Sequence, residues 1–269
     1  MRITLFIVAA VLLGTASPAS AQLAPPPKPI VTSIDRVPMV ELYDGGGGLP
    51  YLGSSTSYNA GDWENALRAY AAPGANGEPS VYLKQVAQID AIADKAIRHS
   101  TKHGWRAKLH RARAAHHGHG PKNLAIVFDV DETLLSNLSA IETDNFTFGP
   151  ASQAEATNEI GKAIPSSLEL FNDAKARGLT IFLITGRREN TRAHTTSNLT
   201  REGFTGYKQL VLKPDASTDS TVVYKSGARA AIEQQGYKII ANVGDQYSDL
   251  AGGHSASAFK LANPFYFLP

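Results

Sequence analysis

From residue 123 onward, short apolar runs alternate with longer amphipathic segments, and this alternation constrains the fold more than any other feature of the chain. Four apolar runs have the length of buried strands, and a fifth strand is expected near the C-terminus: 124–128, 179–184, 209–212, 238–243 and 258–261. Three segments between them have helical character and each stops at a glycine: 166–177, 189–202 and 224–235. Strands and helices that alternate in this way form a parallel sheet covered by helices on both faces. The sequence therefore predicts an α/β fold.

Polar motifs follow these predicted strands in a fixed order. The motifs are Asp129-Val-Asp131-Glu-Thr-Leu after the first strand, Thr185-Gly186-Arg187 after the second, Lys225 in the helix after the third, and Gly244-Asp245-Gln-Tyr-Ser-Asp249 after the fourth. Ligands of open α/β sheets bind at the carboxyl ends of the strands. We therefore expect all four motifs to line a single crevice.

The first motif supplies two carboxylates, Asp129 and Asp131, which lie two residues apart at a strand end. Side chains with this spacing can point the same way. One carboxylate can attack phosphorus as a covalent nucleophile. The other can protonate the leaving oxygen and then deprotonate the hydrolytic water. A lone Asp-x-Asp is also common in surface turns, but its position after a buried strand favours the catalytic interpretation.

Two carboxylates and a phosphate dianion repel one another unless a cation lies between them. A hard cation with oxygen ligands, Mg²⁺, fits this need. The expected ligands are Asp129, Asp245 and the backbone carbonyl of Asp131. Asp249 follows Asp245 by one helical turn and is expected to hold a metal-bound water or to orient Lys225. The alternative for Asp245 is a simple helix N-cap.

Hydrogen-bond donors and positive charge for the phosphoryl oxygens are expected from the second and third motifs. Thr185 offers a hydroxyl and Gly186 a backbone amide. Lys225 would act as a point cation, although a lone lysine is more often a solvated surface residue. Arg187 and Arg188 either contact an anionic substrate or merely begin the following helix at the surface.

Taken together, the motifs resemble those of the haloacid dehalogenase (HAD) superfamily, and more closely its secreted acid phosphatases of subfamily IIIB. These include bacterial class B and class C-like enzymes, plant acid phosphatases and vegetative storage proteins. The matching segments are Phe128-Asp129-Val-Asp131-Glu-Thr-Leu-Leu, Phe182-Leu-Ile-Thr185-Gly186-Arg187, Tyr224-Lys225-Ser226, Gly236-Tyr237-Lys238-Ile239, Gly244-Asp245-Gln-Tyr-Ser-Asp249-Leu and Lys260-Leu-Ala-Asn263-Pro264-Phe. The resemblance extends from about Gly61 to the C-terminus.

The resemblance implies a role for each matching residue. Asp129 would be the nucleophile and Asp131 the general acid and base. Thr185 and Lys225 would hold the phosphate. Asp245 and Asp249 would serve Mg²⁺.

The resemblance also implies a Rossmann-like core with a small cap inserted after the first motif. The segment Ser136–Ala163 is available for this cap. Its large apolar residues, Phe146 and Phe148, either stack on a nucleobase or aryl ester or pack inside the cap. The core, with this cap insertion, is expected to span residues 121–269.

The first 21 residues have the pattern of a secretory signal peptide. Arg2 provides the positive charge, Ile3–Leu13 the apolar region, and Ala19-Ser-Ala21 the small-residue cleavage site. The apolar run is too short to span a membrane. We expect cleavage after Ala21 and a periplasmic or secreted protein. The chain has no cysteine, so it departs from the lipoprotein members of the family, which carry a lipidated N-terminal cysteine.

Two further segments precede the core. Residues 22–60, rich in proline and glycine, are expected to be flexible. Residues 61–120 are expected to form a helical arm with helices at 62–70 and 82–99, the second carrying an apolar stripe. Near the end of this arm lie His110, His116, His117 and His119, either as a solvated linker or as a transition-metal site.

These observations predict a secreted, Mg²⁺-dependent acid phosphatase that hydrolyses phosphate monoesters, with nucleoside monophosphates among the candidates, through an aspartyl-phosphate. A net charge of +2 argues against a nucleic-acid polymer or a membrane anchor as a partner. A phosphotransferase of the same fold, or a non-catalytic storage or binding relative, is the alternative. A phospho-receiver switch is disfavoured because Asp131 would promote turnover of the phosphorylated state.

Overall fold

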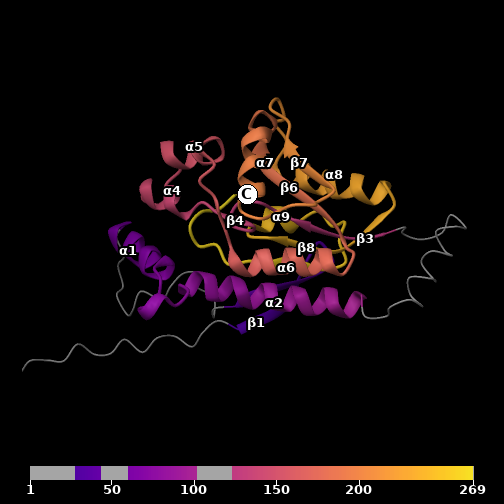
Figure 1. The fold of residues 1–269 in the computed structure, drawn as a ribbon, viewed down its shortest axis with the longest axis horizontal. Coiled ribbons are helices and arrows are strands. Elements are labelled where there is room, and N and C mark those ends of the chain that lie inside the picture. Colours follow the sequence, from indigo (N-terminus) through magenta and orange to yellow (C-terminus); the bar gives the residue numbers. More distant parts are fainter. Residues whose placement is uncertain (1–27, 44–59, 102–122, 269) are drawn as a thin grey trace, which may run out of the picture.

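The computed structural model describes residues 28–43, 60–101 and 123–268. In these ranges a seven-stranded sheet has the strand order β1-β2-β9-β8-β3-β6-β7. Figure 1 shows the fold with its elements labelled where there is room. Its strands are β1 (Lys28–Ile34), β2 (Val37–Tyr43), β3 (Asn123–Phe128), β6 (Thr180–Arg188), β7 (Gln209–Lys213), β8 (Tyr237–Gly244) and β9 (Ala258–Lys260). Every neighbouring pair is parallel except β1 and β2. The predicted α/β fold with a parallel sheet is confirmed.

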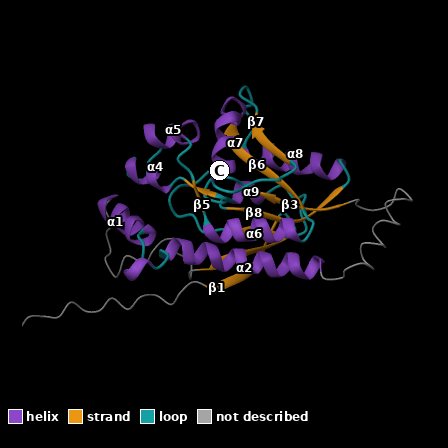
Figure 2. Cartoon of the chain, in the orientation of Figure 1, coloured by secondary structure: helices purple, strands orange, loops and turns teal. Residues whose placement is uncertain are grey.

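Strand β3 lies inside the sheet, between β8 and β6, and both of its faces are apolar. Ile126 and Phe128 belong to the larger core, which includes residues of helices α2 (Val81–Thr101) and α6 (Pro165–Ala176). Ala125 and Val127 point to the opposite face and pack with Ile232 of helix α8 (Thr221–Gln234). Figure 2 shows the helices flanking the strands. Successive residues of a strand point to opposite faces. Because both faces of β3 are covered, every residue of the run has to be apolar.

The remaining elements carry the connections. The helices are α1 (Ala60–Ala71), α4 (Leu138–Thr143), α5 (Pro150–Asn158), α7 (Arg192–Arg201) and α9 (Tyr247–Leu250), with short 3₁₀ turns η1 (Ala75–Gly77) and η2 (Glu189–Thr191). Two short strands, β4 (Leu135–Ser136) and β5 (Lys162–Ala163), pair antiparallel and enclose α4 and α5. The segment from β4 to β5 follows the first motif and coincides with the segment expected to form a cap. The predicted helix 189–202 begins instead as the 3₁₀ turn η2 before α7.

The prediction that residues 22–60 are flexible is wrong for residues 28–43, which form the β1–β2 hairpin at the sheet edge. Val37 and Met39 are buried, whereas Val31 is 73% exposed. The turn residues Asp35 and Arg36 adopt φ values of 48° and 67°. Such turns normally use asparagine or glycine, so the sequence carries no hairpin signal there. The glycine run 45–48 lies outside the described residues.

Two other predictions also fall outside the described residues. These are the signal peptide 1–21 with its cleavage after Ala21, and the histidines of residues 110–119. Within the ranges that the structure describes, no helix combines the length and the apolar character needed to cross a membrane.

The arm helix α2 is fastened to the core by a buried carboxylate. Asp90 is 3% exposed, and its Oδ2 accepts hydrogen bonds from Ser166 Oγ at 2.7 Å and Ser167 Oγ at 2.9 Å. Both serines lie in the first turn of α6. Burial raises the pKa of Asp90 from 3.8 to about 6. Folding therefore extends the pH range of the protonated acid from below about 4 to below about 6.

Asp90 should make the stability of the protein depend on pH. Because its pKa is raised on folding, its contribution is complete below pH about 4 and is lost as the pH rises through about 6. Asp90→Asn removes the titrating proton. The free energy of unfolding of the variant should therefore gain about 2 kcal/mol relative to wild type between about pH 4.5 and 7. Urea unfolding at several pH values measures this difference, and a difference that does not change with pH would contradict the prediction.

Candidate active site

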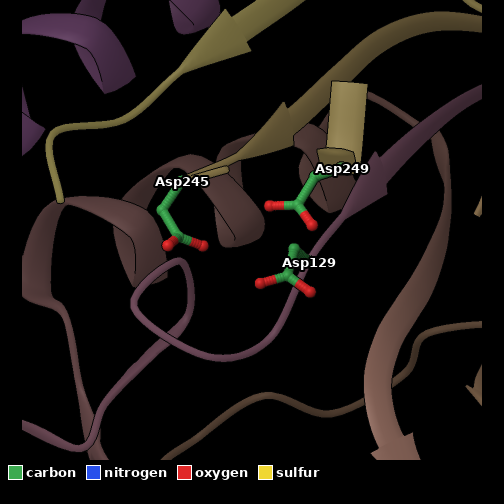
Figure 3. Close-up of side chains that lie close together, drawn as sticks. All are labelled: Asp129, Asp245 and Asp249. Atoms are coloured by element: carbon green, nitrogen blue, oxygen red, sulfur yellow. The ribbon is translucent and has the colours of Figure 1, made fainter. Parts of the chain in front are cut away.

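Three carboxylates meet at the carboxyl ends of the adjacent strands β3 and β8. Asp129 follows β3 directly, Asp245 follows β8, and Asp249 lies in α9. All three are buried, and one oxygen of each lies within 4.8 Å of the others (Figure 3). The Asp129 backbone amide donates to the Val243 carbonyl at 2.9 Å, which joins the two strand ends. The parallel sheet therefore brings together two motifs that are more than a hundred residues apart.

Lys225 provides the positive charge beside this cluster. Helix α8 is capped by Ser220, whose Oγ accepts from the Val223 amide at 3.3 Å, so Lys225 lies early in the helix. Its Nζ is 2.5 Å from Asp129 Oδ1 and 2.6 Å from Asp249 Oδ1. Burial lowers the pKa of the Lys225 ammonium, but the two carboxylates more than offset this effect and raise it. Lys225 is 3% exposed and is not a solvated surface residue.

Asp245 is held by hydrogen bonds from three side chains. Its Oδ1 accepts from Thr133 Oγ1 at 3.1 Å, and its Oδ2 accepts from Gln246 Nε2 and Asn263 Nδ2, each at 2.7 Å. Burial and the charge of Asp249 raise the pKa of Asp245 to about 6. The N-cap of α9 is Gln246, so Asp245 does not serve as that cap.

Gly244 allows Asp249 to fold back over the strand end. A Cβ at Gly244 would lie 2.6 Å from the Asp249 Cβ, which no real pair of such atoms tolerates. The Gln246 amide then donates to Asp249 Oδ2 at 2.9 Å. The glycine of the fourth motif is therefore required by close packing.

The second acid of the first motif, Asp131, lies apart from the three clustered carboxylates and pairs with Arg187. Arg187 Nη2 is 2.6 Å and its Nε 2.9 Å from Asp131 Oδ1, and Asn137 Nδ2 donates to the same oxygen at 2.8 Å. Burial raises the pKa of Asp131, but Arg187 and Asn137 outweigh it and lower the pKa overall. Of the two alternatives left open for Arg187, the surface position is excluded because the residue is only 7% exposed.

The second motif lies next to Asp131. Thr185 is fully buried, its Oγ1 is 3.4 Å from Asp131 Oδ2, and it accepts from the Arg187 amide at 3.1 Å. The pairing of β6 with β7 shifts register after Thr185. Gly186 is exposed and has open space on the side where a Cβ would project. A phosphoryl oxygen can therefore approach this backbone without a steric clash.

The two phenylalanines of the segment between β4 and β5 differ in their exposure and contacts. Phe148 is 79% exposed. Phe146 is partly buried; its ring stacks on Phe265 with centroids 6.0 Å apart, and the Arg68 guanidinium lies 5.3 Å from its centroid. The structure thus gives Phe146 a packing role between the arm, this segment and the C-terminal residues.

Sequence reasoning assigned no role to several residues at the site. Asn137 and Asn263 hold Asp131 and Asp245, and an isolated asparagine carries no signal of that kind. Glu155 of α5 is half-buried, and burial together with the charge of Asp131 raises its pKa to about 9. Glu132 could have been noticed, because it sits inside the first motif.

Comparisons with known proteins identify the family of this chain. The family model described as HAD superfamily, subfamily IIIB (acid phosphatase) matches residues 57–269. Acid phosphatase 1 of Solanum lycopersicum is 38% identical over 148 residues, which are 53% of this chain and 58% of that protein. Vegetative storage protein 1 of Arabidopsis thaliana is 34% identical over 148 residues, 53% of this chain and 55% of the relative. The chain thus spans somewhat more than half the length of these relatives.

Among solved structures, the class C acid phosphatase from Bacillus anthracis with tungstate bound is similar at a TM-score of 0.46 and 20% identity, covering 68% of this chain and 87% of that one. The family model covers most of the chain, including all four motifs and the residues that hold them in place. The chain therefore belongs to subfamily IIIB, the acid phosphatase subfamily, of the HAD superfamily.

Proposed function

We propose that this protein is a phosphomonoesterase that uses Asp129 as a covalent nucleophile and Mg²⁺ as its cofactor. The observation that carries the proposal is the environment of Asp129. This buried carboxylate lies 2.5 Å from Lys225 and within 4.8 Å of the carboxylates of Asp245 and Asp249. Membership of an acid phosphatase subfamily supports the same reaction.

The donor set fits a hard divalent cation. Asp129, Asp245 and Asp249 offer carboxylate oxygens, the ligands that Mg²⁺ prefers, and the backbone carbonyl of Asp131 is a further candidate. Burial and the neighbouring acids raise the pKa of Asp129 and of Asp245, so this cluster needs positive charge beyond that of Lys225. A bound Mg²⁺ would neutralise these acids and the incoming phosphate dianion.

Each side chain of the site has its own role in the two halves of the reaction. A bond forms from an Asp129 oxygen to phosphorus while the ester P–O bond breaks, and Asp131, which has to enter this step protonated, gives its proton to the departing alcohol. In the second half, water attacks phosphorus, the bond to Asp129 breaks, and Asp131 takes the proton from the water. Lys225, Thr185 and the Gly186 amide would hold the phosphoryl oxygens.

Selectivity among esters is assigned to the segment between β4 and β5, because the motif residues contact only phosphate and metal. Nucleoside monophosphates and aryl phosphates are the candidate substrates. Phe148 is the aromatic residue available to stack on them, since it is exposed, whereas Phe146 is engaged by Phe265 and Arg68. Residues 1–21 support export to the periplasm or the medium.

A panel of phosphomonoesters assayed with and without EDTA tests the proposal. Nitrophenyl phosphate, a nucleoside monophosphate and glycerol phosphate should each release phosphate, EDTA should abolish release, and Mg²⁺ should restore it. Phosphate appearing on an added nucleoside would instead identify a phosphotransferase. A folded protein that turns over none of these esters would contradict the proposal and favour a storage role.

Asp245→Asn should weaken metal binding more than it weakens the fold. The amide loses the negative charge that attracts the cation, so the Mg²⁺ concentration for half-maximal activity should rise about ten-fold or more. The Mg²⁺-dependent increase in melting temperature should shrink in parallel. The exposed Asp219→Asn serves as the control and should behave as wild type. An unchanged metal requirement in Asp245→Asn would remove this residue from the ligand set.

A further inference from the structure

Glu132 is a buried acid in the catalytic loop to which the reaction described above gives no role. It follows Asp131 directly, is fully buried, and has a φ of 51°, in the left-handed region that glutamate rarely adopts. Strained backbone of this kind persists only where the surroundings over-determine it. The contacts of the Glu132 side chain therefore indicate what holds the loop in this conformation.

Both oxygens of Glu132 are used. Oε1 accepts from the backbone amide of Asn137 at 2.6 Å. Oε2 accepts from Ser136 Oγ at 3.0 Å and from Tyr82 Oη at 2.9 Å. Asn137 is also the residue whose side chain donates to Asp131 at 2.8 Å. Hydrogen bonds thus join Tyr82 to Glu132 and Glu132 to the backbone of Asn137, and the side chain of that same asparagine reaches the Asp131 carboxylate.

Tyr82 does not belong to the catalytic core. It lies at the start of α2, fifty positions before Glu132 in the sequence, and is 1% exposed. Its ring packs edge-on against Phe265, with centroids 5.0 Å apart, and lies tilted against the Tyr70 ring, with centroids 6.2 Å apart. These ring contacts fix the direction of the hydroxyl. A residue needed only to fill this apolar cluster would not require a hydroxyl.

We propose that Tyr82 is a positioning residue for the reaction: through Glu132 and Asn137 it holds the Asp131 carboxylate in the orientation that protonates the leaving group. This inference rests on the proposed phosphomonoesterase function. The helical arm then completes the active site as well as covering the core. Loss of the Tyr82 hydroxyl leaves Glu132 Oε2 with one donor fewer and loosens the loop that carries Asn137. Proton transfer should suffer before substrate binding does.

Tyr82→Phe tests the inference, because it keeps the ring contacts and removes only the hydroxyl. Its kcat for glycerol phosphate should fall about ten-fold, a fraction of what general acid catalysis contributes, while KM stays within about two-fold. Nitrophenyl phosphate, whose leaving group needs less protonation, should lose less. Tyr70→Phe is the matched control. Its hydroxyl contacts Gln85, its ring packs on Tyr82 and Phe265, and its kcat should stay within about two-fold of wild type.

The outcomes separate this inference from the proposed function. Wild-type protein without phosphomonoesterase activity would overturn both. If the wild type is active, two results would overturn the inference and leave the proposed function standing. One is a Tyr82→Phe variant whose kcat is unchanged, and the other is a variant whose kcat falls equally on both esters. Should Tyr82→Phe fail to fold, Ser136→Ala removes the other side-chain donor to the same Glu132 oxygen. Ser136→Ala should show the same leaving-group-dependent loss of kcat. A Ser136→Ala variant without that loss would equally overturn the inference.

Discussion

Replacement of Asp129 by asparagine should abolish turnover while leaving the fold intact. The amide has nearly the same shape and can still accept a hydrogen bond from Lys225, which now lies 2.5 Å from the Asp129 carboxylate. It is, however, a poor nucleophile and a weaker metal ligand. Loss of a covalent nucleophile costs on the order of 10⁴ or more in kcat. Steady-state hydrolysis of nitrophenyl phosphate by wild type and variant, at saturating Mg²⁺, measures this loss.

Asp173→Asn provides the control for this experiment. Asp173 lies on α6, its side chain is 43% exposed, and its partners are the surface groups Arg98 and Arg177. The activity of the Asp173→Asn variant should stay within about two-fold of wild type, because surface substitutions rarely affect more than local contacts. Near-normal turnover by a folded Asp129→Asn protein would exclude this residue as the nucleophile.

Replacement of Lys225 by methionine should have the largest effect on stability. Methionine keeps much of the volume but leaves Asp129 and Asp249, whose side chains are 7% and 5% exposed, without their shared cation. Breaking a buried ion pair by removing one partner costs about 3–5 kcal/mol. We expect a loss of that order in the free energy of unfolding, measured by urea denaturation in the presence of EDTA.

The same experiment with Lys84→Met shows what an exposed pair is worth. Lys84 lies 2.8 Å from Glu78, with side chains 50% and 63% exposed. Surface pairs contribute about 0–1 kcal/mol, so this variant should unfold almost as wild type does. Equal losses in the two lysine variants would mean that Lys225 does not neutralise the acid cluster.

The sequence predicted the core of the site because the fold places strand ends together. The apolar run before Asp129 required a strand buried on both faces, and a parallel sheet brings the end of that strand beside Gly244. Thr185 lies in the other neighbour, β6, just beyond the residues that pair with β3, and is brought to the site for the same reason. The alternation of strands and helices thus contains most of the information about the position of the motifs.

The parts that could not be predicted depend on contacts between distant segments. The Asp35-Arg36 turn of the β1–β2 hairpin lacks the asparagine or glycine that is typical of such turns. Tyr82 begins the predicted helix 82–99, but its hydroxyl meets Glu132 only after α2 has packed on the core. The contacts of Phe146 with Phe265 and Arg68 likewise join three remote segments. Local patterns carry no information about these pairings.

Trapping of the aspartyl-phosphate tests the central claim most directly. The wild-type protein is mixed with a phosphomonoester and Mg²⁺, quenched during turnover and reduced with borohydride, which converts an acyl phosphate of aspartate into homoserine. Peptide mass spectrometry then locates the converted residue. We predict homoserine at position 129, dependent on substrate and absent from the Asp129→Asn variant. Conversion at Asp131 or elsewhere, or steady turnover with an unmodified Asp129, would contradict the account.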